Sequence, residues 1–312
     1  MAAPNKDGVL FDFSPMLIVY KDGRVDRIAD FPFVPPSPED PSAAVSSKDV
    51  TISPHISARI YLPKLAAADQ KLPILVWFHG GGFCIESAFS SLYHRYLNIL
   101  ASEAQAVAVS VEYRLAPENP LPAAYEDCWE ALQWVASHAH PEKIGVKEPW
   151  LVNHGNFDKI LIGGDSAGGN IVHNTLIRAG KIGEVKITGA ILSYPYFWGS
   201  FEADTESLAG RVWGFVYPTA PDGIDNPLIN PFVENAPKLS GLGCSRMFVC
   251  VGEKDELKGV GIRYVEEVKK SGWDGDIELI NVEGEDHVFD IFDPYSDKAK
   301  YLIGHIASFI QH

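Results

Sequence analysis

The sequence is poor in several features that would point to particular classes of protein. Only four of its 312 residues are cysteine, no two of them form a CxxC pair, and no Asn-x-Ser/Thr sequon occurs. Because a dense disulfide framework is lacking, we expect reduced thiols. No run of about eighteen apolar residues is present, and the N-terminus has no apolar signal segment. We therefore expect a cytoplasmic protein, with entry into the nucleus open to a chain of this size.

Basic charge is also scarce. The chain has 26 Lys and Arg against 41 Asp and Glu, which gives a formal net charge of −15. Such a chain repels phosphate backbones and anionic lipids, and no basic run offsets this repulsion. The ten histidines form no HExxH pair and show no other metal-ligand spacing. We expect no nucleic-acid partner, no membrane surface, no metal and no cofactor.

Apolar sequence, in contrast, is plentiful. At 46% hydrophobic residues the chain can bury one large core. Strand-like runs alternate with helical patterns, which is typical of a largely parallel sheet covered by helices on both faces. The strand-like runs are residues 58–62, 72–78, 106–111, 159–163, 187–194, 246–252 and 276–282, and helical spacing recurs over 125–135, 170–177, 260–268 and 302–309. We predict a single α/β domain spanning residues 1–312.

The most informative motif is a serine between two glycines at the end of a strand-like run. The segment from Gly164 to Gly168 reads GDSAG, follows the run 159–163 and precedes a helical pattern. A strand, a sharp turn and a helix in this order form a nucleophile elbow, which exposes the hydroxyl of the central serine. Small neighbours are required because the turn strains the backbone of that residue. The motif predicts that Ser166 is a nucleophile.

A second glycine motif favours this interpretation over an ordinary Gly-Ser turn. The segment from His79 to Gly82 reads HGGG and follows another strand-like run, so its backbone N–H groups are unobstructed. We predict that Gly81, Gly82 and Ala167 donate N–H groups to the oxyanion of an acyl-transfer intermediate. His79 is expected to order the loop rather than to catalyse.

Two later strand-like runs supply a base and a carboxylate. Residues 246–252 lead into Asp255, and residues 276–282 lead into His287. The carboxyl ends of parallel strands share one edge of a sheet, so both loops can meet the serine. An imidazole accepts the hydroxyl proton during attack, and a carboxylate fixes its tautomer and stabilises the imidazolium. We assign His287 as the base and Asp255 as the carboxylate.

Other ionisable residues near these motifs are weaker candidates. Glu253, Glu256 and Asp286 could replace Asp255, but the side chain of Asp286 points away from its neighbour His287 if the segment is extended. Asp165 is expected to hold the elbow through local hydrogen bonds. His94 and His173 follow the two glycine motifs, and each could border the pocket or simply pack in the interior.

Two stretches fall outside the alternation of strands and helices: residues 1 to about 44 and about 198 to 240. We predict that they form a cap over the site, because an aromatic lid excludes water and binds apolar substrate. The predicted substrate-binding residues are Phe83, Trp213, Phe215 and Tyr217. Packing of the cap against the body explains each of these aromatic side chains equally well.

Taken together, these motifs resemble the plant carboxylesterases of the hormone-sensitive-lipase type, within the α/β-hydrolase superfamily. The resemblance rests on HGGGF at 79–83, VEYRLAPE at 111–118, GDSAGGN at 164–170 and GEDHVF at 284–289. The chain order Ser, Asp, His is also that of an α/β-hydrolase. The resemblance implies the α/β-hydrolase fold, the same triad of Ser166, Asp255 and His287, and hydrolysis of a small-molecule ester without a cofactor.

Members of that family also imply alternatives. Isoflavanone dehydratases use the site for elimination, and some alkaloid cyclases resemble this chain over 129–138 and 170–181. A base beside an oxyanion hole can remove a proton alpha to a carbonyl, so a lyase, dehydratase or cyclase of plant specialised metabolism stays open. A hormone-type receptor is less favoured, since the gibberellin receptors lost the histidine that this chain keeps as His287. Neither the substrate nor the oligomeric state follows from the sequence.

Overall fold

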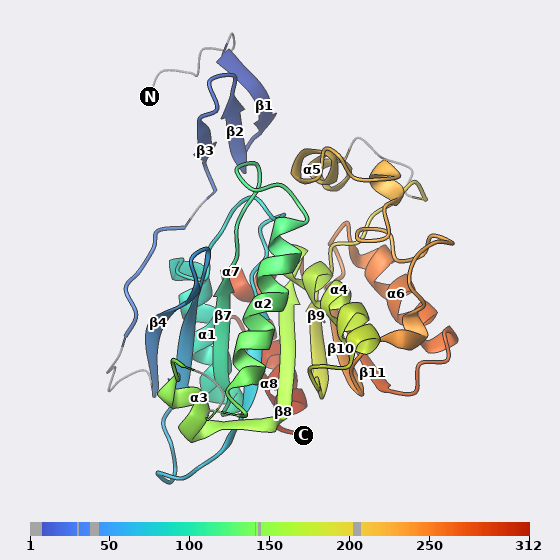
Figure 1. Ribbon diagram of the computed structural model, residues 1–312. Helices are drawn as coiled ribbons and strands as arrows, with labels where there is room; N and C mark the ends of the chain where they lie inside the picture. Colours follow the sequence, from blue (N-terminus) through green and yellow to red (C-terminus); the bar gives the residue numbers. More distant parts are fainter. Residues whose placement is uncertain (1–7, 30, 38–43, 141, 143–144, 202–206) are drawn as a thin grey trace.

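A mostly parallel eight-stranded sheet forms the centre of the protein (Figure 1). The computed structural model describes residues 8–29, 31–37, 44–140, 142, 145–201 and 207–312. The strand order is β11-β10-β9-β8-β6-β7-β5-β4, and only the β4/β5 and β5/β7 pairs are antiparallel. The strands are β4 (Val45–Ser53), β5 (Ile56–Pro63), β6 (Leu72–Phe78), β7 (Val107–Glu112), β8 (Gly155–Asp165), β9 (Gly189–Ser193), β10 (Arg246–Gly252) and β11 (Asp276–Val282).

Side chains of the central strands alternate between two hydrophobic cores, one on each face of the sheet. In β6, Ile74 and Val76 pack into one core and Leu75 and Trp77 into the other, and all four are fully buried. Successive residues of a strand point to opposite faces, so an unbroken apolar run is needed when both faces are covered. This is why the runs that form central strands, such as 72–78 and 246–252, lack polar alternation.

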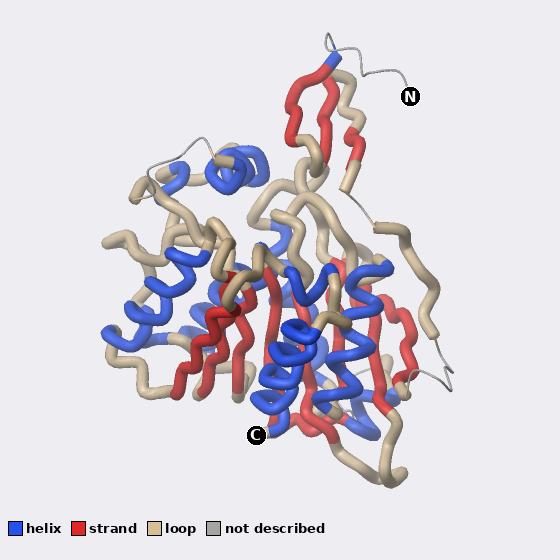
Figure 2. The backbone as a smooth tube through the Cα atoms, turned by 180° about the vertical axis from the view of Figure 1, so that it is seen from behind, coloured by secondary structure: helices blue, strands red, loops and turns tan. Residues whose placement is uncertain are grey.

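Helices cover both faces of the sheet. The first face carries α2 (Ala123–Ser137), α4 (Ala167–Ile182) and α6 (Lys258–Lys270), and the second carries α1 (Ser91–Ala104), α7 (Phe289–Phe292) and α8 (Asp297–Gln311). In Figure 1 the first set lies in front of the sheet, and Figure 2 shows the molecule from behind. A short helix, α3 (Pro149–His154), precedes β8. The predicted α/β layering is therefore observed.

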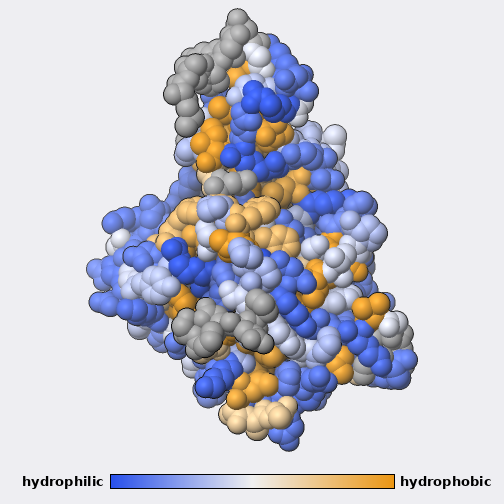
Figure 3. Space-filling view, turned by 90° about the vertical axis from the view of Figure 1, so that its left-hand side faces the viewer, coloured by the Kyte–Doolittle hydropathy of each residue, from blue (hydrophilic) through white to orange (hydrophobic). Residues whose placement is uncertain are grey.

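A small N-terminal sheet stands above the body. It consists of β1 (Val9–Phe13), β2 (Leu17–Tyr20) and β3 (Val25–Arg27), paired antiparallel. Figure 3 shows this lobe from the side, with apolar side chains gathered on it and at its base. The ring of Phe215, on α5 (Leu208–Val216), packs against Phe11 and Phe13 at centroid distances of 5.4 and 4.8 Å. Residues 1–7, 30, 38–43 and 202–206 of the predicted cap lie outside the described residues.

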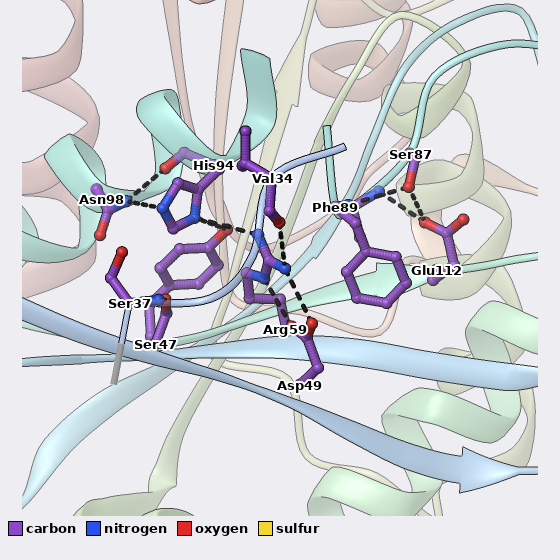
Figure 4. A network of polar contacts seen from close by, with 12 residues as sticks. Val34, Ser37, Ser47, Asp49, Arg59, Ser87, Phe89, His94, Asn98 and Glu112 are labelled. Carbon is purple, nitrogen blue, oxygen red and sulfur yellow. Dashed lines mark hydrogen bonds and ion pairs between the residues drawn. The ribbon is translucent and has the colours of Figure 1, made fainter. Parts of the chain in front are cut away.

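The segment that joins this lobe to the sheet, residues 31–37, is fixed by a buried arginine (Figure 4). Arg59 on β5 is only 1% exposed, donates to the carbonyl oxygen of Val34 at 2.9 Å, and pairs through two nitrogens with Asp49 at 2.6 and 2.9 Å. The backbone N–H of Ser37 donates to the hydroxyl of Ser47 at 2.8 Å, and the backbone N–H of Ser47 donates to the carbonyl oxygen of Ser37 at 2.7 Å. The sheet thereby holds this connection in place.

Candidate active site

Ser166 occupies the turn between β8 and α4 in a strained backbone conformation. Its φ and ψ angles are 55° and −116°, a region that residues with a side chain rarely adopt. A Cβ atom at Gly168 would overlap the carbonyl oxygen of Phe78, and one at Gly164 would lie 2.6 Å from the same oxygen. The two glycines therefore let the turn pass directly behind β6. Each predicted feature of the elbow is present in the geometry.

The loops after β10 and β11 bring Asp255 and His287 together. Nδ1 of His287 lies 2.7 Å from Oδ2 of Asp255, and the other oxygen of Asp255 accepts the backbone N–H of Leu257 at 2.8 Å. The Asp255 side chain is buried, whereas 31% of the His287 side chain is exposed. The ring of Tyr194 packs edge-on against His287 at 5.6 Å. The carboxylate thus fixes one ring nitrogen and leaves Nε2 for another partner.

The glycine loop after β6 adopts a backbone that only glycine accommodates easily. Gly81 and Gly82 have φ angles of 92° and 59°, and a Cβ atom at Gly81 would overlap the carbonyl oxygen of Ile85. Within the part of the chain that the structure describes, the backbone N–H groups of Gly81 and Gly82 donate no hydrogen bond. Ala167 is the first residue of α4, so its N–H has no partner within the helix. All three predicted donors are available in this geometry.

His79 orders this loop, as its sequence position suggests. Its Nδ1 lies 2.8 Å from the carbonyl oxygen of Gly80, which can only accept, so Nδ1 carries the proton. The ring is fully buried and stacks on Tyr113 at 4.2 Å, and burial lowers the pKa of His79 to about 4. The Tyr113 hydroxyl donates to the carbonyl oxygen of His79 at 2.7 Å. A neutral imidazole thus holds the backbone of the loop.

One cavity of about 920 Å³ joins these groups. Ser166, Asp255, His287, Gly81 and Gly82 all line it. Its walls are largely apolar, and many of the apolar side chains come from three parts of the chain. The N-terminal part contributes Met16, Ile28, Ala29 and Phe31, α5 contributes Leu208, Ala209 and Val212, and the C-terminal loops contribute Leu257, Val288, Ile291 and Phe292.

The four aromatic residues predicted to bind substrate do not line this cavity. Phe83 is fully buried against Tyr125, with ring centroids 5.8 Å apart. Trp213 donates its indole N–H to a backbone carbonyl at 2.8 Å and packs on Tyr217, and Phe215 faces the N-terminal lobe. Composition indicates an aromatic cap but not the direction of each ring. The wall residues that this prediction missed carry one signal, the i, i+4 spacing of apolar residues along α5.

Other candidates from the sequence also have different surroundings. Asp165 lines the cavity, and within the described ranges its carboxyl accepts a hydrogen bond from Tyr93, 72 residues away, at 2.7 Å, rather than from the elbow. Burial raises the pKa of this carboxyl to about 7. Asp286 lines the cavity and accepts the N–H of His287 at 2.7 Å. His94 and His173 do not border the cavity. His94 lies beside Arg59, and His173 is buried.

Neither a metal site nor a membrane span is present in the described ranges. No group of three or more His, Cys, Asp or Glu residues there is arranged to hold a metal ion. Each helix in those ranges is too short or too polar to cross a bilayer. The four cysteines are buried, and no disulfide joins them.

The sheet, the strained serine turn and the Asp-His pair at one sheet edge define an α/β protein with a nucleophile elbow. Residues 75–291 match the family model described as α/β hydrolase fold, and the chain belongs to this family. The predicted fold class is confirmed. An esterase from Pyrobaculum calidifontis has a similar structure, with a TM-score of 0.70 and 30% identity, covering 85% of this chain and 84% of that chain.

Two plant proteins are similar over almost their whole length. A 2-hydroxyisoflavanone dehydratase from Glycyrrhiza echinata is 54% identical, covering 96% of this chain and 95% of that protein. Tabersonine synthase from Catharanthus roseus is 49% identical, covering 98% of this chain and 99% of that protein. Within this family, similar chains thus carry the names of different reactions.

Proposed function

We propose that the protein is a serine carboxylesterase that hydrolyses a small-molecule ester through an acyl-enzyme. The observation that carries this proposal is the hydrogen bond between Asp255 and His287, which lies at the same cavity as Ser166. A buried carboxylate on Nδ1 leaves Nε2 of His287 unprotonated and able to accept the serine proton. The similarity to an esterase of known structure supports the same reaction.

The reaction begins when the Ser166 hydroxyl oxygen attacks the ester carbonyl carbon and its proton passes to Nε2 of His287. The N–H groups of Gly81, Gly82 and Ala167 hold the resulting oxyanion. The bond to the alcohol oxygen then breaks, and His287 returns the proton to the leaving alcohol. Water attacks the acyl-serine in the same way, releasing the acid and the free hydroxyl of Ser166.

The walls of the cavity define the class of substrate. Most side chains from the N-terminal part and from α5 are aliphatic, including Met16, Ile28, Leu208 and Val212. Burial of apolar substrate surface against them contributes roughly 25 cal/mol per Å². We therefore propose a largely apolar small-molecule ester as the substrate.

The test combines hydrolysis of short-chain p-nitrophenyl esters with fluorophosphonate labelling and peptide mapping. Wild-type protein is expected to turn over an ester and to carry the label on Ser166. Ser166→Ala is expected to lose both signals, whereas Ser137→Ala, at the end of α2, keeps them. Absence of turnover and of labelling in the wild type would refute the proposal.

The second candidate is a dehydratase, lyase or cyclase, favoured by the 54% identity to a plant dehydratase and the 49% identity to a synthase. In that reaction His287 would remove a proton alpha to a carbonyl, with the oxyanion hole holding the enolate. Product analysis in ¹⁸O-labelled water separates the two reactions. Ester hydrolysis places one labelled oxygen in the acid product, whereas elimination and cyclisation incorporate none.

A further inference from the structure

Tyr93 connects the two loops that would perform the reaction. It lies in the first turn of α1 and is only 2% exposed. Its hydroxyl accepts the backbone N–H of Gly80 at 2.7 Å and donates to Oδ2 of Asp165 at 2.7 Å. Gly80 belongs to the glycine loop after β6, and Asp165 immediately precedes Ser166. One hydroxyl therefore bridges the oxyanion loop and the nucleophile elbow.

The surroundings of Gly80 leave this loop little freedom. A Cβ atom at Gly80 would overlap Oδ2 of Asp165 and would lie 3.1 Å from the Tyr93 hydroxyl. The carbonyl of the same residue is held by the ring of His79 at 2.8 Å. In a trans peptide the C=O of Gly80 and the N–H of Gly81 point in opposite directions. Fixing Gly80 on both sides therefore fixes the direction of the Gly81 donor.

The bridge needs a hydroxyl that donates and accepts at the same time. Burial raises the pKa of Tyr93 well above its usual value, so the phenol keeps its proton. The proton can then serve Asp165 while a lone pair of the oxygen serves Gly80. Phenylalanine fills the same space but makes neither bond. Tyr93→Phe thus removes the bridging oxygen atom and keeps the packing of the ring.

We propose that Tyr93 and Asp165 are positioning residues that set the distance and angle between the oxyanion donors and Ser166. This inference rests on the proposed ester hydrolysis. A donor displaced by a fraction of an ångström stabilises the oxyanion of the transition state less, but it hardly affects binding of the neutral ester. Loss of the bridge therefore lowers kcat and leaves KM nearly unchanged.

The test compares Tyr93→Phe with Tyr264→Phe. Tyr264 is equally buried, and its hydroxyl lies 2.9 Å from Nδ1 of His173, away from both loops. Tyr93→Phe is expected to lower kcat about tenfold or more, the loss that corresponds to one hydrogen bond of the transition state. Binding of a trifluoromethyl ketone, which forms an oxyanion on the serine, should weaken by the same factor. Tyr264→Phe should lose comparable thermal stability but keep kcat and ketone affinity.

A double-mutant cycle with Asp165 supplies the second measurement. Asp165→Asn retains an acceptor for the Tyr93 hydroxyl and should keep more activity than Asp165→Leu. Removing the hydroxyl in the Asp165→Leu background should have little further effect, because the bridge is already broken. If Tyr93→Phe fails to fold, the difference between the two Asp165 variants carries the test.

Two outcomes separate this inference from the proposed function. If the wild type hydrolyses esters and Tyr93→Phe keeps its kcat and its affinity for the ketone, the positioning role is refuted and the esterase proposal stands. Equal losses in Tyr93→Phe and Tyr264→Phe would also refute it, because they would reflect general destabilisation. If the wild type shows neither turnover nor labelling, the proposed function fails and the inference fails with it.

Discussion

Nδ1 of His287 lies 2.7 Å from Oδ2 of Asp255, although 32 residues separate the two in the chain. The pairing follows from the sheet, in which β10 and β11 are parallel neighbours in register, with Gly252 opposite Val282. Both strands end at the same edge, so the loops that follow them meet there. The carboxylate is buried and the ring is partly exposed, as a proton carrier at a cavity requires.

Substitution of Asp255 by Asn should prevent His287 from acting as a base, although Asn fills the same space as Asp. The Asn amide would donate to Nδ1, which forces the proton of the imidazole onto Nε2, where it blocks proton transfer from the serine. We expect kcat for ester hydrolysis to fall by about 10⁴-fold, with the protein still folded. Glu253→Gln is the matched control, because Gln keeps an acceptor for the N–H of Gly284. Steady-state kinetics would contradict the assignment if Asp255→Asn retained the wild-type rate.

A second prediction concerns the backbone contact behind Ser166. Gly168→Ala would push a methyl group into the carbonyl oxygen of Phe78, and neither α4 nor β6 can move away without disturbing the core. We expect a loss of stability of about 3 kcal/mol or more, measured by urea denaturation. Gly304→Ala, in α8 with nothing within 4 Å, should instead gain up to about 1 kcal/mol. Equal effects at the two positions would contradict the close approach.

The third prediction concerns the attachment of residues 31–37. Arg59→Met removes the bonds to Val34 and Asp49 and leaves the partly buried carbonyl oxygen of Val34 without its donor. We expect a loss of about 2 kcal/mol in the free energy of unfolding. KM should rise as well, since Phe31 on this segment lines the cavity. Arg24→Met, which breaks a solvent-exposed pair, should change neither quantity. An unchanged KM in Arg59→Met would show that this wall does not depend on its attachment.

The fourth prediction follows from a buried carboxyl behind His287. Asp290 accepts the hydroxyl of Tyr194 at 2.8 Å, and burial raises its pKa from 3.8 to about 6. A raised carboxyl pKa means that the folded state binds the proton more tightly. This contribution to stability is therefore complete below pH 4 and is lost as the pH rises through about 6.

Asp290→Asn removes this titration, so its stability relative to the wild type should improve as the pH rises. Between pH 4 and pH 8 the difference in the free energy of unfolding should grow in favour of the variant, by on the order of 2 kcal/mol. Urea denaturation across this pH range measures the difference. A difference that stays constant with pH would contradict the prediction.

The sequence predicted the central strands well because both faces of the sheet are covered. Such strands must be continuously apolar, as in β6 and β10, and runs of this kind stand out in the sequence. The edge strand β4 was missed, since half of its positions are polar and partly exposed. The three strands of the N-terminal lobe were also missed, because they are only three to five residues long. Their positions depend on contacts with α5 that are remote in the chain.

In the candidate site, too, some residues were predicted from the sequence and others were missed. Ser166, Gly81 and Gly82 were identified because the turns they form require particular residue types at fixed spacing. The bond from Tyr93 to Asp165 spans 72 residues and has no spacing rule, so the sequence indicated only local hydrogen bonds for Asp165. The aromatic residues of the cap failed as substrate contacts because composition does not give the direction of a ring. Turns with fixed spacing, and loops that a parallel sheet brings to one edge, as with Asp255 and His287, can thus be predicted from the sequence. A contact that follows from neither rule, such as that between Tyr93 and Asp165, cannot.

The proposed reacting groups and a large part of the cavity wall lie on separate pieces of chain. The former follow β6, β8, β10 and β11, whereas much of the wall belongs to the N-terminal lobe, its connection to the sheet, and α5. Exchanging only these outer pieces between relatives should transfer substrate specificity and leave the proposed catalytic residues unchanged. A chimaera of this kind would show whether these outer pieces decide which reaction each of these similar chains performs.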